Sequence, residues 1–265
     1  MKNILLWTFA ILLTLGSAVY QRMTGPTHPV RGSVELAESQ IKYRLIRSYP
    51  RPQDAPVRIR VEDQNVEGFF IYKRTPSHDS WKQLPLKREG EFLVAYIPQQ
   101  PPAGKVQYLV SLQKGEEIVK LTPNPIVIRF RGDVPALFMI PHILFMFLAM
   151  LLSTRAGVAA IFAESNVWKL TLWTFITFVV GGLILGPIIQ KYAFGDWWTG
   201  WPFGTDLTDN KTAFAFLFWA FALFRVYKNR KHRTWVIIAS VVMLLIYLIP
   251  HSMLGSEIDF TQELP

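Results

Sequence analysis

The feature that most constrains this chain is the segment from Leu170 to Ile189, in which no residue carries a charge. A helix of about 20 apolar residues is needed to cross the hydrocarbon core of a membrane. Three further apolar runs lie in the same half of the chain, at 135–152, 212–227 and 235–249. Backbone polar groups in lipid must be bonded within the protein, so each run is predicted to be a transmembrane helix.

The first residues of the chain, 1–20, form another apolar segment, with Lys2 before it and Gly16-Ser17-Ala18 near its end. This composition suits a cleaved signal peptide or a retained anchor helix, and either would export the following segment to the same side of the membrane. We favour the retained anchor, which brings the number of predicted transmembrane helices to five.

Residues 21–134 are more polar and alternate apolar and polar side chains as β-strands do. Strands are predicted at 41–47, 57–61, 69–72, 92–97, 106–110 and 126–130, with weaker candidates at 81–84 and 117–121. Seven or eight short strands separated by Pro- and Gly-rich turns predict an antiparallel β-sandwich. This segment is similar to fibronectin type III-like modules in the order Trp81, Glu89-Gly90-Glu91-Phe92, Ile97-Pro98, Gly104 and Tyr108.

The predicted fold class is a membrane protein with an α-helical transmembrane bundle, four helices plus an N-terminal anchor, and an inserted all-β sandwich domain. The predicted domains are the anchor or signal peptide at 1–20, the sandwich at 21–134 and the four-helix membrane domain at 135–265. The membrane domain includes a Trp- and Asp-rich loop at 191–211 and a C-terminal tail.

Charge predicts the orientation of the helices. The net charge is +9, and cations gather at 228–233 and at Arg155 and Lys169, whereas the 191–211 loop and the tail contain acids. The positive-inside rule places 228–233 in the cytoplasm and residues 21–134, the loop and the tail outside. Topology thus explains much of the positive charge, so no nucleic-acid partner is expected. The expected partners are the lipid bilayer and other membrane protein subunits.

Two histidines are candidate ligands, because the tripeptide Ile-Pro-His occurs twice and ends at His142 and at His251. Two imidazoles on neighbouring helices could hold one divalent metal ion or the iron of haem b. Alternatively, each histidine bonds a nearby carbonyl and fastens a helix end. The chain has no cysteine, which excludes thiol catalysis, zinc–thiolate sites, iron–sulfur clusters and disulfides.

The 191–211 loop adds candidate carboxylates. Asp206 and Asp209 offer oxygen ligands for a metal ion, and Asp209 or Asn210 is placed to cap a helix expected to begin near Thr212. In an enzyme acting on a lipid-linked or envelope substrate, the acid–base residues would be drawn from Asp196, Asp206, Asp209 and Glu257.

Four segments of the membrane half are similar to a family of uncharacterised bacterial inner-membrane proteins. They are Phe194-Gly-Asp-Trp-Trp-Thr-Gly-Trp-Pro-Phe-Gly-Thr-Asp-Leu-Thr-Asp-Asn-Lys211, Ile249-Pro-His-Ser-Met-Leu-Gly-Ser-Glu257, Val134-Pro-Ala and Ile140-Pro-His-Ile-Leu-Phe-Met. The resemblance implies a multi-pass protein of a Gram-negative-type inner membrane, with the sandwich and the C-terminus in the periplasm. The family has no assigned activity, so no catalytic residue is implied.

Three functions remain open. The first is a periplasm-facing binding or accessory subunit of a membrane protein complex. The second is a metal- or haem b-binding protein that uses His142 and His251, and the third is the membrane enzyme described above. Transport is disfavoured, because 170–189 and 235–249 contain none of the ionisable groups that transporters place near the middle of the membrane.

Overall fold

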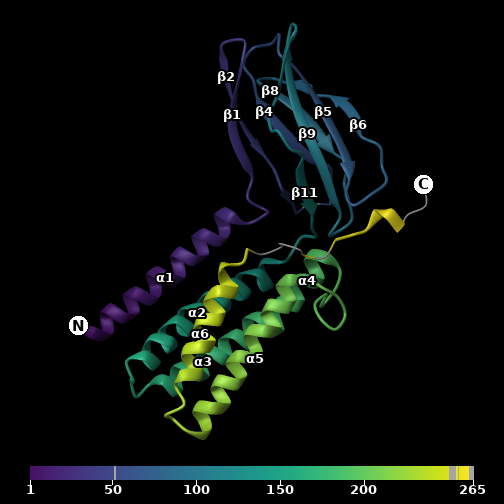
Figure 1. Cartoon of the computed structure of the whole chain (residues 1–265). Coiled ribbons are helices and arrows are strands. Elements are labelled where there is room, and N and C mark those ends of the chain that lie inside the picture. Colours follow the sequence, from purple (N-terminus) through teal and green to yellow (C-terminus); the bar gives the residue numbers. More distant parts are fainter. Residues whose placement is uncertain (51, 251–254, 256, 263–265) are drawn as a thin grey trace. The chain divides into compact units, whose positions relative to one another are not determined.

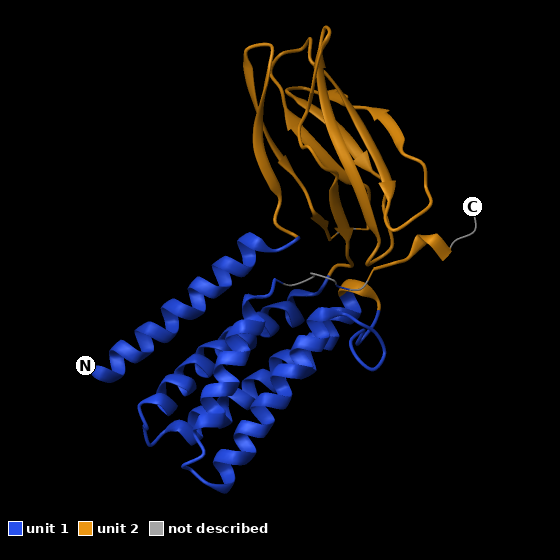
Figure 2. Ribbon diagram, in the orientation of Figure 1, with its two compact units in different colours: residues 1–26, 134–192, 196–256 blue, residues 27–133, 193–195, 257–265 orange. Residues whose placement is uncertain are grey.

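The computed structural model describes residues 1–50, 52–250, 255 and 257–262. The chain forms two compact units, coloured separately in Figure 2. The helical unit comprises residues 1–26, 134–192 and 196–256, and the β-unit comprises residues 27–133, 193–195 and 257–265. Each unit has its own hydrophobic core.

The helical unit contains five stretches of helix, labelled in Figure 1. Their bounds are α1 Lys2–Thr24, α2 Ala136–Ile161, the continuous stretch α3 Val167–Phe178, η1 Val179–Leu185 and α4 Gly186–Phe194, then α5 Leu207–Lys228 and α6 Thr234–Leu248. Three of them are long and apolar enough to cross a membrane: α1, α2 and the α3–η1–α4 stretch. Helix α6 is a shorter apolar helix of 15 residues.

The sequence located these helices but placed several of their ends wrongly. We expected the first run to end at Ser153-Thr154-Arg155, whereas α2 continues for two further turns to Ile161. Arg155 is therefore inside a helix and only 1% exposed. Helix α5 starts at Leu207, five residues before the predicted start.

Many of the buried residues of the helical unit are small or hydroxylated, and large apolar residues are exposed on its outside. Leu137, Ile140 and Leu144 form an exposed stripe on α2, and Phe214, Leu217, Phe221 and Phe224 form one on α5. Ala149, Ser153, Ala156 and Gly157 of α2 are buried. Helices in lipid associate through such small residues because lipid tails solvate large apolar side chains as well as a protein core does.

Helix α1 packs against α2 and α6 through one face. Ala10, Thr14 and Ser17 are buried on that face, and Asn3 lies two turns before them and Gln21 one turn after them. The Gln21 amide donates to the carbonyls of Tyr247 (2.9 Å) and Ile249 (3.4 Å) at the end of α6. Helix α1 is thus a packed member of the helical unit.

The middle of the third helical stretch is a π-helix, η1, rather than the regular helix that we expected. Pro187 is the second residue after η1 and lacks the N–H that an α-helix would use at that position. Gly181 lies in this segment, and a Cβ there would come within 3.0 Å of Met146 and Phe145 of α2. The wide turn and the missing side chain let the two helices approach closely.

The β-unit consists of β-strands arranged in three sheets. Strands β1 Val30–Leu36 and β2 Ser39–Leu45 form a hairpin, and β4 Ala55–Arg60, β8 Phe92–Ile97 and β7 Lys87–Glu89 form the second sheet. The third sheet has the order β3 Ser48–Tyr49, β11 Ile126–Phe130, β9 Lys105–Lys114, β5 Glu67–Arg74 and β6 Lys82–Pro85, with β10 Glu117–Lys120 also paired to β9. The β3–β11 pair is parallel and every other pair is antiparallel.

The core of the β-unit is built from alternating residues of several strands. Strand β9 contributes Val106, Tyr108, Val110 and Leu112, which pack with residues of β4, β5, β8 and β11. All eight predicted segments contain strands, whereas β1, β3 and β7 were missed. Hairpin β1–β2 turns at Ala37 and Glu38, both with positive φ, so the Gly or Asn that usually marks such a turn is absent.

Two segments from outside the predicted domain 21–134 belong to the β-unit. The carbonyl of Ala193 accepts a hydrogen bond from Gly132 (2.9 Å), and the ring of Phe194 lies 3.8 Å from the Arg129 guanidinium. Near the C-terminus, Phe260 is 4% exposed and lies under the guanidinium of Arg74. The chain therefore returns twice to the β-unit after leaving it at residue 133.

Helices α2 and α6 approach closely at Gly157, where a Cβ would lie 2.7 Å from Ser240 Cβ. Gly157→Ala should therefore lower the free energy of unfolding by about 1–3 kcal/mol, because one helix has to move. Gly16→Ala in α1 is the matched control, since a Cβ there meets nothing within 4 Å. It should be neutral or stabilising by up to about 1 kcal/mol. Thermal unfolding in detergent measures both, and equal effects would contradict the close approach.

Candidate functional site

The polar residues at the start of α5 hold the loop that precedes this helix. Asp206 is the N-cap: its Oδ1 accepts from the backbone N–H of Thr208 (2.7 Å) and of Asp209 (3.4 Å). The prediction that Asp209 or Asn210 caps this helix was wrong, because the helix begins five residues earlier than the apolar pattern indicated. The capping chemistry was expected correctly, but it belongs to Asp206.

Asp209 ties the loop to the helix. Its Oδ2 accepts from the backbone N–H groups of Thr199 (2.7 Å) and Gly200 (3.1 Å) and from the Gln190 side chain (2.9 Å). Asn210 adds a bond from Trp201 N–H to its Oδ1 at 2.6 Å. A Cβ on Gly200 would lie 2.6 Å from Asp209 Cβ, so only glycine allows this approach.

Burial decides the protonation behaviour of two groups that precede the apolar part of α5. The pKa of Asp209 is raised, because burial outweighs the bonds from Thr199, Gln190 and Gly200. The pKa of Lys211 is lowered by burial, and the negative charge of Asp206 opposes this effect. Both groups thus carry their charge at a cost.

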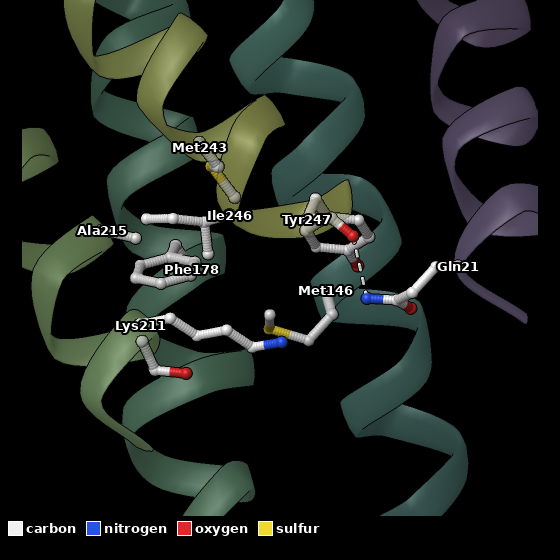
Figure 3. A pocket seen from close by; sticks show the side chains of 9 residues that line it. Gln21, Met146, Phe178, Lys211, Ala215, Met243, Ile246 and Tyr247 are labelled. Atoms are coloured by element: carbon white, nitrogen blue, oxygen red, sulfur yellow. Dashed lines mark hydrogen bonds between the residues drawn. The ribbon is translucent and has the colours of Figure 1, made fainter. Parts of the chain in front are cut away.

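Lys211 lines a pocket at this end of the helical unit (Figure 3). The side chain is 7% exposed, and its ammonium donates to the carbonyl of Ile249 at 2.8 Å. The pocket is lined by Gln21, Met146, Phe178, Lys211, Thr212, Ala215, Met243, Ile246 and Tyr247, so each of the five helical stretches contributes to it. Its walls are mainly apolar, and Lys211 brings the one formal charge among them.

His142 lies in α2, and its Nδ1 is 2.9 Å from the carbonyl oxygen of Gly181 in η1. The same carbonyl accepts the backbone N–H of Gly186. The contact matches the structural alternative for this histidine, in which it bonds a nearby carbonyl. His251, the other predicted ligand, lies outside the described residues.

The other predicted acid–base residues, Asp196 and Glu257, differ in their surroundings. Asp196 is exposed in the loop, whereas Glu257 forms an ion pair with Lys105 inside the β-unit. Among the described residues, no group of three or more His, Asp or Glu side chains could hold a metal ion. The carboxylates of Asp206 and Asp209 are hydrogen-bonded to backbone N–H groups instead.

The opposite end of the helical unit contains a second buried charge, Arg155. Its Nη2 donates to Glu164 (2.6 Å) and to Asn3 of α1 (2.9 Å). Its guanidinium lies 5.5 Å from the ring of Trp7. Arg155 thus joins α1 to α2 and to the turn that follows α2.

No protein-family model matches the chain, and no curated protein or solved structure matches it.

Sequence reasoning missed Lys211 as a site residue, because it stood at the boundary between a loop and an apolar run. A signal for it exists. Lys211 continues the helical spacing of the buried residues of α5, Ala215, Trp219, Ala222 and Val226. A lysine in phase with a buried stripe is expected to face the interior of a helical bundle.

Replacing Asp209 by alanine should destabilise the loop, because buried N–H groups of Thr199 and Gly200 would lose their acceptor. Each such group costs about 1–3 kcal/mol. Asp196→Ala removes the same charge from an exposed position of the same loop and is the matched control. We expect a lower unfolding temperature and faster proteolysis within 195–206 for Asp209→Ala alone. Normal stability with lost cellular function would instead favour an acid–base role.

Proposed function

We propose that this protein is a multi-pass inner-membrane protein that acts as a periplasm-facing binding or accessory subunit of a membrane protein complex. The observation that carries the proposal is the make-up of the β-unit, which combines residues 27–133 with the returning segments 193–195 and 257–262. A folded unit fixed at several points of a membrane-embedded chain is suited to holding a partner at the membrane surface.

The two returns also support five membrane crossings. Because 133 and 193–195 both belong to the β-unit, α2 and the α3–η1–α4 stretch either both cross the membrane or both do not. Both are long and apolar enough to cross. The same reasoning applies to α5 and α6, which lie between 195 and 257. We therefore propose that α5 and α6 cross as well, although α6 is short.

The charges of the helical unit support the proposed orientation. Contacts of Lys2 with Phe162, of Asn3 with Arg155 and of Arg230 with Trp168 gather the cationic segments at one end. The acidic residues Asp206 and Asp209 lie at the start of α5, which is the other end of that helix. The positive-inside rule then assigns the cationic end to the cytoplasm and the β-unit to the periplasm.

We further propose that the β-unit is an immunoglobulin- or fibronectin-like sandwich. In support, the inward residues of β4 and β8 share one core with those of β5, β9 and β11, which belong to another sheet. Such units commonly serve recognition rather than catalysis. Trp81, Leu84 and Ile118 are exposed apolar side chains of this unit and are candidates for contact with a partner.

The subunit proposal predicts a stoichiometric partner. Extraction of the tagged full-length protein in a mild detergent, after crosslinking in cells, should recover the same partner at a constant ratio. Extraction in a denaturing detergent without crosslinking is the control and should release it. A protein that migrates as a monomer after mild extraction, with and without crosslinking, would contradict the proposal.

One observation favours the second candidate function, a metal- or haem b-binding protein. Metal-binding histidines usually donate one ring N–H to a carbonyl or carboxylate, which fixes the other nitrogen toward the metal. The contact of His142 Nδ1 with the Gly181 carbonyl has this geometry and would direct Nε2 to a ligand. His251 remains the predicted second ligand.

If His142 binds a metal ion or haem, protein purified in mild detergent without chelators should contain about one molar equivalent of it, because a single site is predicted. His142→Ala should lose that equivalent, whereas His78→Ala in the β-unit should keep it. Elemental analysis and the visible absorption spectrum measure both. If His142→Ala changes only the unfolding temperature, the histidine serves to join α2 to η1.

A further inference from the structure

The first two strands of the β-unit form a hairpin, labelled β1 and β2 in Figure 1, whose two faces differ. One face belongs to the core of the unit, where Leu36, Ile41 and Leu45 are buried and Val34 packs against them. Because side chains alternate along a strand, the residues between these point away from the core. This outward face carries six exposed side chains, which are Arg31, Ser33 and Glu35 of β1 and Gln40, Lys42 and Arg44 of β2.

Three cations lie together on the outward face. Arg31 is directly opposite Arg44 across the hairpin, and Lys42 is opposite Ser33, the next outward residue of β1. Like charges directly opposite each other destabilise a pair of strands. Within the described residues, none of the three cations forms an ion pair. Their mutual repulsion is thus not offset by a carboxylate of the described chain.

The exposed cations of another strand are arranged differently. Arg58 and Arg60 of β4 also alternate along a strand, but Arg58 lies 4.0 Å from Glu89 and Arg60 lies 3.0 Å from Glu91. Charges of both signs are interspersed in this way on a surface that only needs to stay in water. The outward face of the β1–β2 hairpin lacks that balance, which indicates a partner of opposite charge.

The charge changes sign along the hairpin. The three cations lie in the part nearer to α1 along the chain, whereas Glu35 and Glu38 lie at or beside the turn. Five residues, 25–29, separate the end of α1 from the start of β1. A fully extended link of that length spans about 20 Å. Because α1 is long and apolar enough to cross a membrane, the chain keeps the positive end of the hairpin near the membrane surface.

We propose that the outward face of the β1–β2 hairpin binds the anionic headgroups of the lipid bilayer, with Arg31, Lys42 and Arg44 contacting lipid phosphates. Arginine and lysine form charge-assisted hydrogen bonds with phosphate, and several neighbouring cations are attracted together to an extended negative surface. The lipid charge also offsets the repulsion between Arg31 and Arg44. The proposal requires α1 to be retained and to cross the membrane, but it does not require a partner protein.

The test uses the purified full-length protein in nanodiscs of phosphatidylcholine alone, or of equal parts of phosphatidylcholine and phosphatidylglycerol. Because the chain has no cysteine, Ser33→Cys provides a single site on this face for an uncharged fluorophore. A fixed small fraction of phosphatidylcholine with a nitroxide on its headgroup quenches the fluorophore when the face lies on the bilayer. We expect phosphatidylglycerol to increase quenching about twofold or more, since each cation near an anionic surface changes the bound population about fivefold. High salt should reverse the increase, because it screens exposed charges.

Neutralising the face with Arg31→Gln, Lys42→Gln and Arg44→Gln together should abolish the increase. The same variant should unfold at an equal or higher temperature, because the repulsion between Arg31 and Arg44 is removed. Misfolding would lower that temperature, so the two measurements separate loss of lipid binding from loss of structure.

The matched control combines Lys82→Gln, Lys87→Gln and Lys120→Gln, which removes three exposed cations from other strands and should preserve the increase. The proposal is overturned if phosphatidylglycerol leaves quenching unchanged, if the neutralised face still responds, or if the control loses the response as well. A face that ignores phosphatidylglycerol but binds soluble polyglutamate would serve an acidic protein, and the proposal would equally be wrong.

Discussion

In the helical unit, polar groups have to form their hydrogen bonds within the protein, and this requirement determines how the helices are joined. Lipid offers them no hydrogen bonds, so each donor and acceptor must find a partner inside the protein. Thr171, Thr174 and Thr177 of α3 meet it locally, by donating to carbonyls one turn earlier. Gln21 and His142 meet it between helices, by binding carbonyls at the end of α6 and in η1. The same bonds that satisfy polar groups therefore also join the helices.

This requirement explains which parts of the fold the sequence could predict. The hydrophobic pattern is summed over many residues, and it located the long helices and most of the strands. Single residues set the ends. Arg155 looked like a terminator of α2, yet Glu164 and Asn3 bond it inside the protein, and the helix continues. Such tertiary bonds override the local hydrophobic pattern, and no window of neighbouring residues reveals them.

The candidate site was predictable in its chemistry but not in its arrangement. Asp209 or Asn210 was expected to cap a helix, and Asp206 and Asp209 were expected to hold a metal ion. The cap is Asp206 instead, because the helix begins earlier than the apolar pattern indicated. The π-helix and the hairpin turn at Ala37 and Glu38 were missed for a related reason. Both are backbone conformations set by packing, and the hairpin turn lacks the Gly or Asn that usually marks such a turn.

The position of Lys211 follows from two helices rather than one. A cation near the N-terminus of α5 opposes the dipole of its own helix, where Asp206 and Asp209 are the favourable residues. Its ammonium instead lies at the carboxyl end of α6, where the partial charge is negative and the carbonyl of Ile249 accepts its hydrogen bond. The lysine is therefore held by the neighbour and not by its own helix.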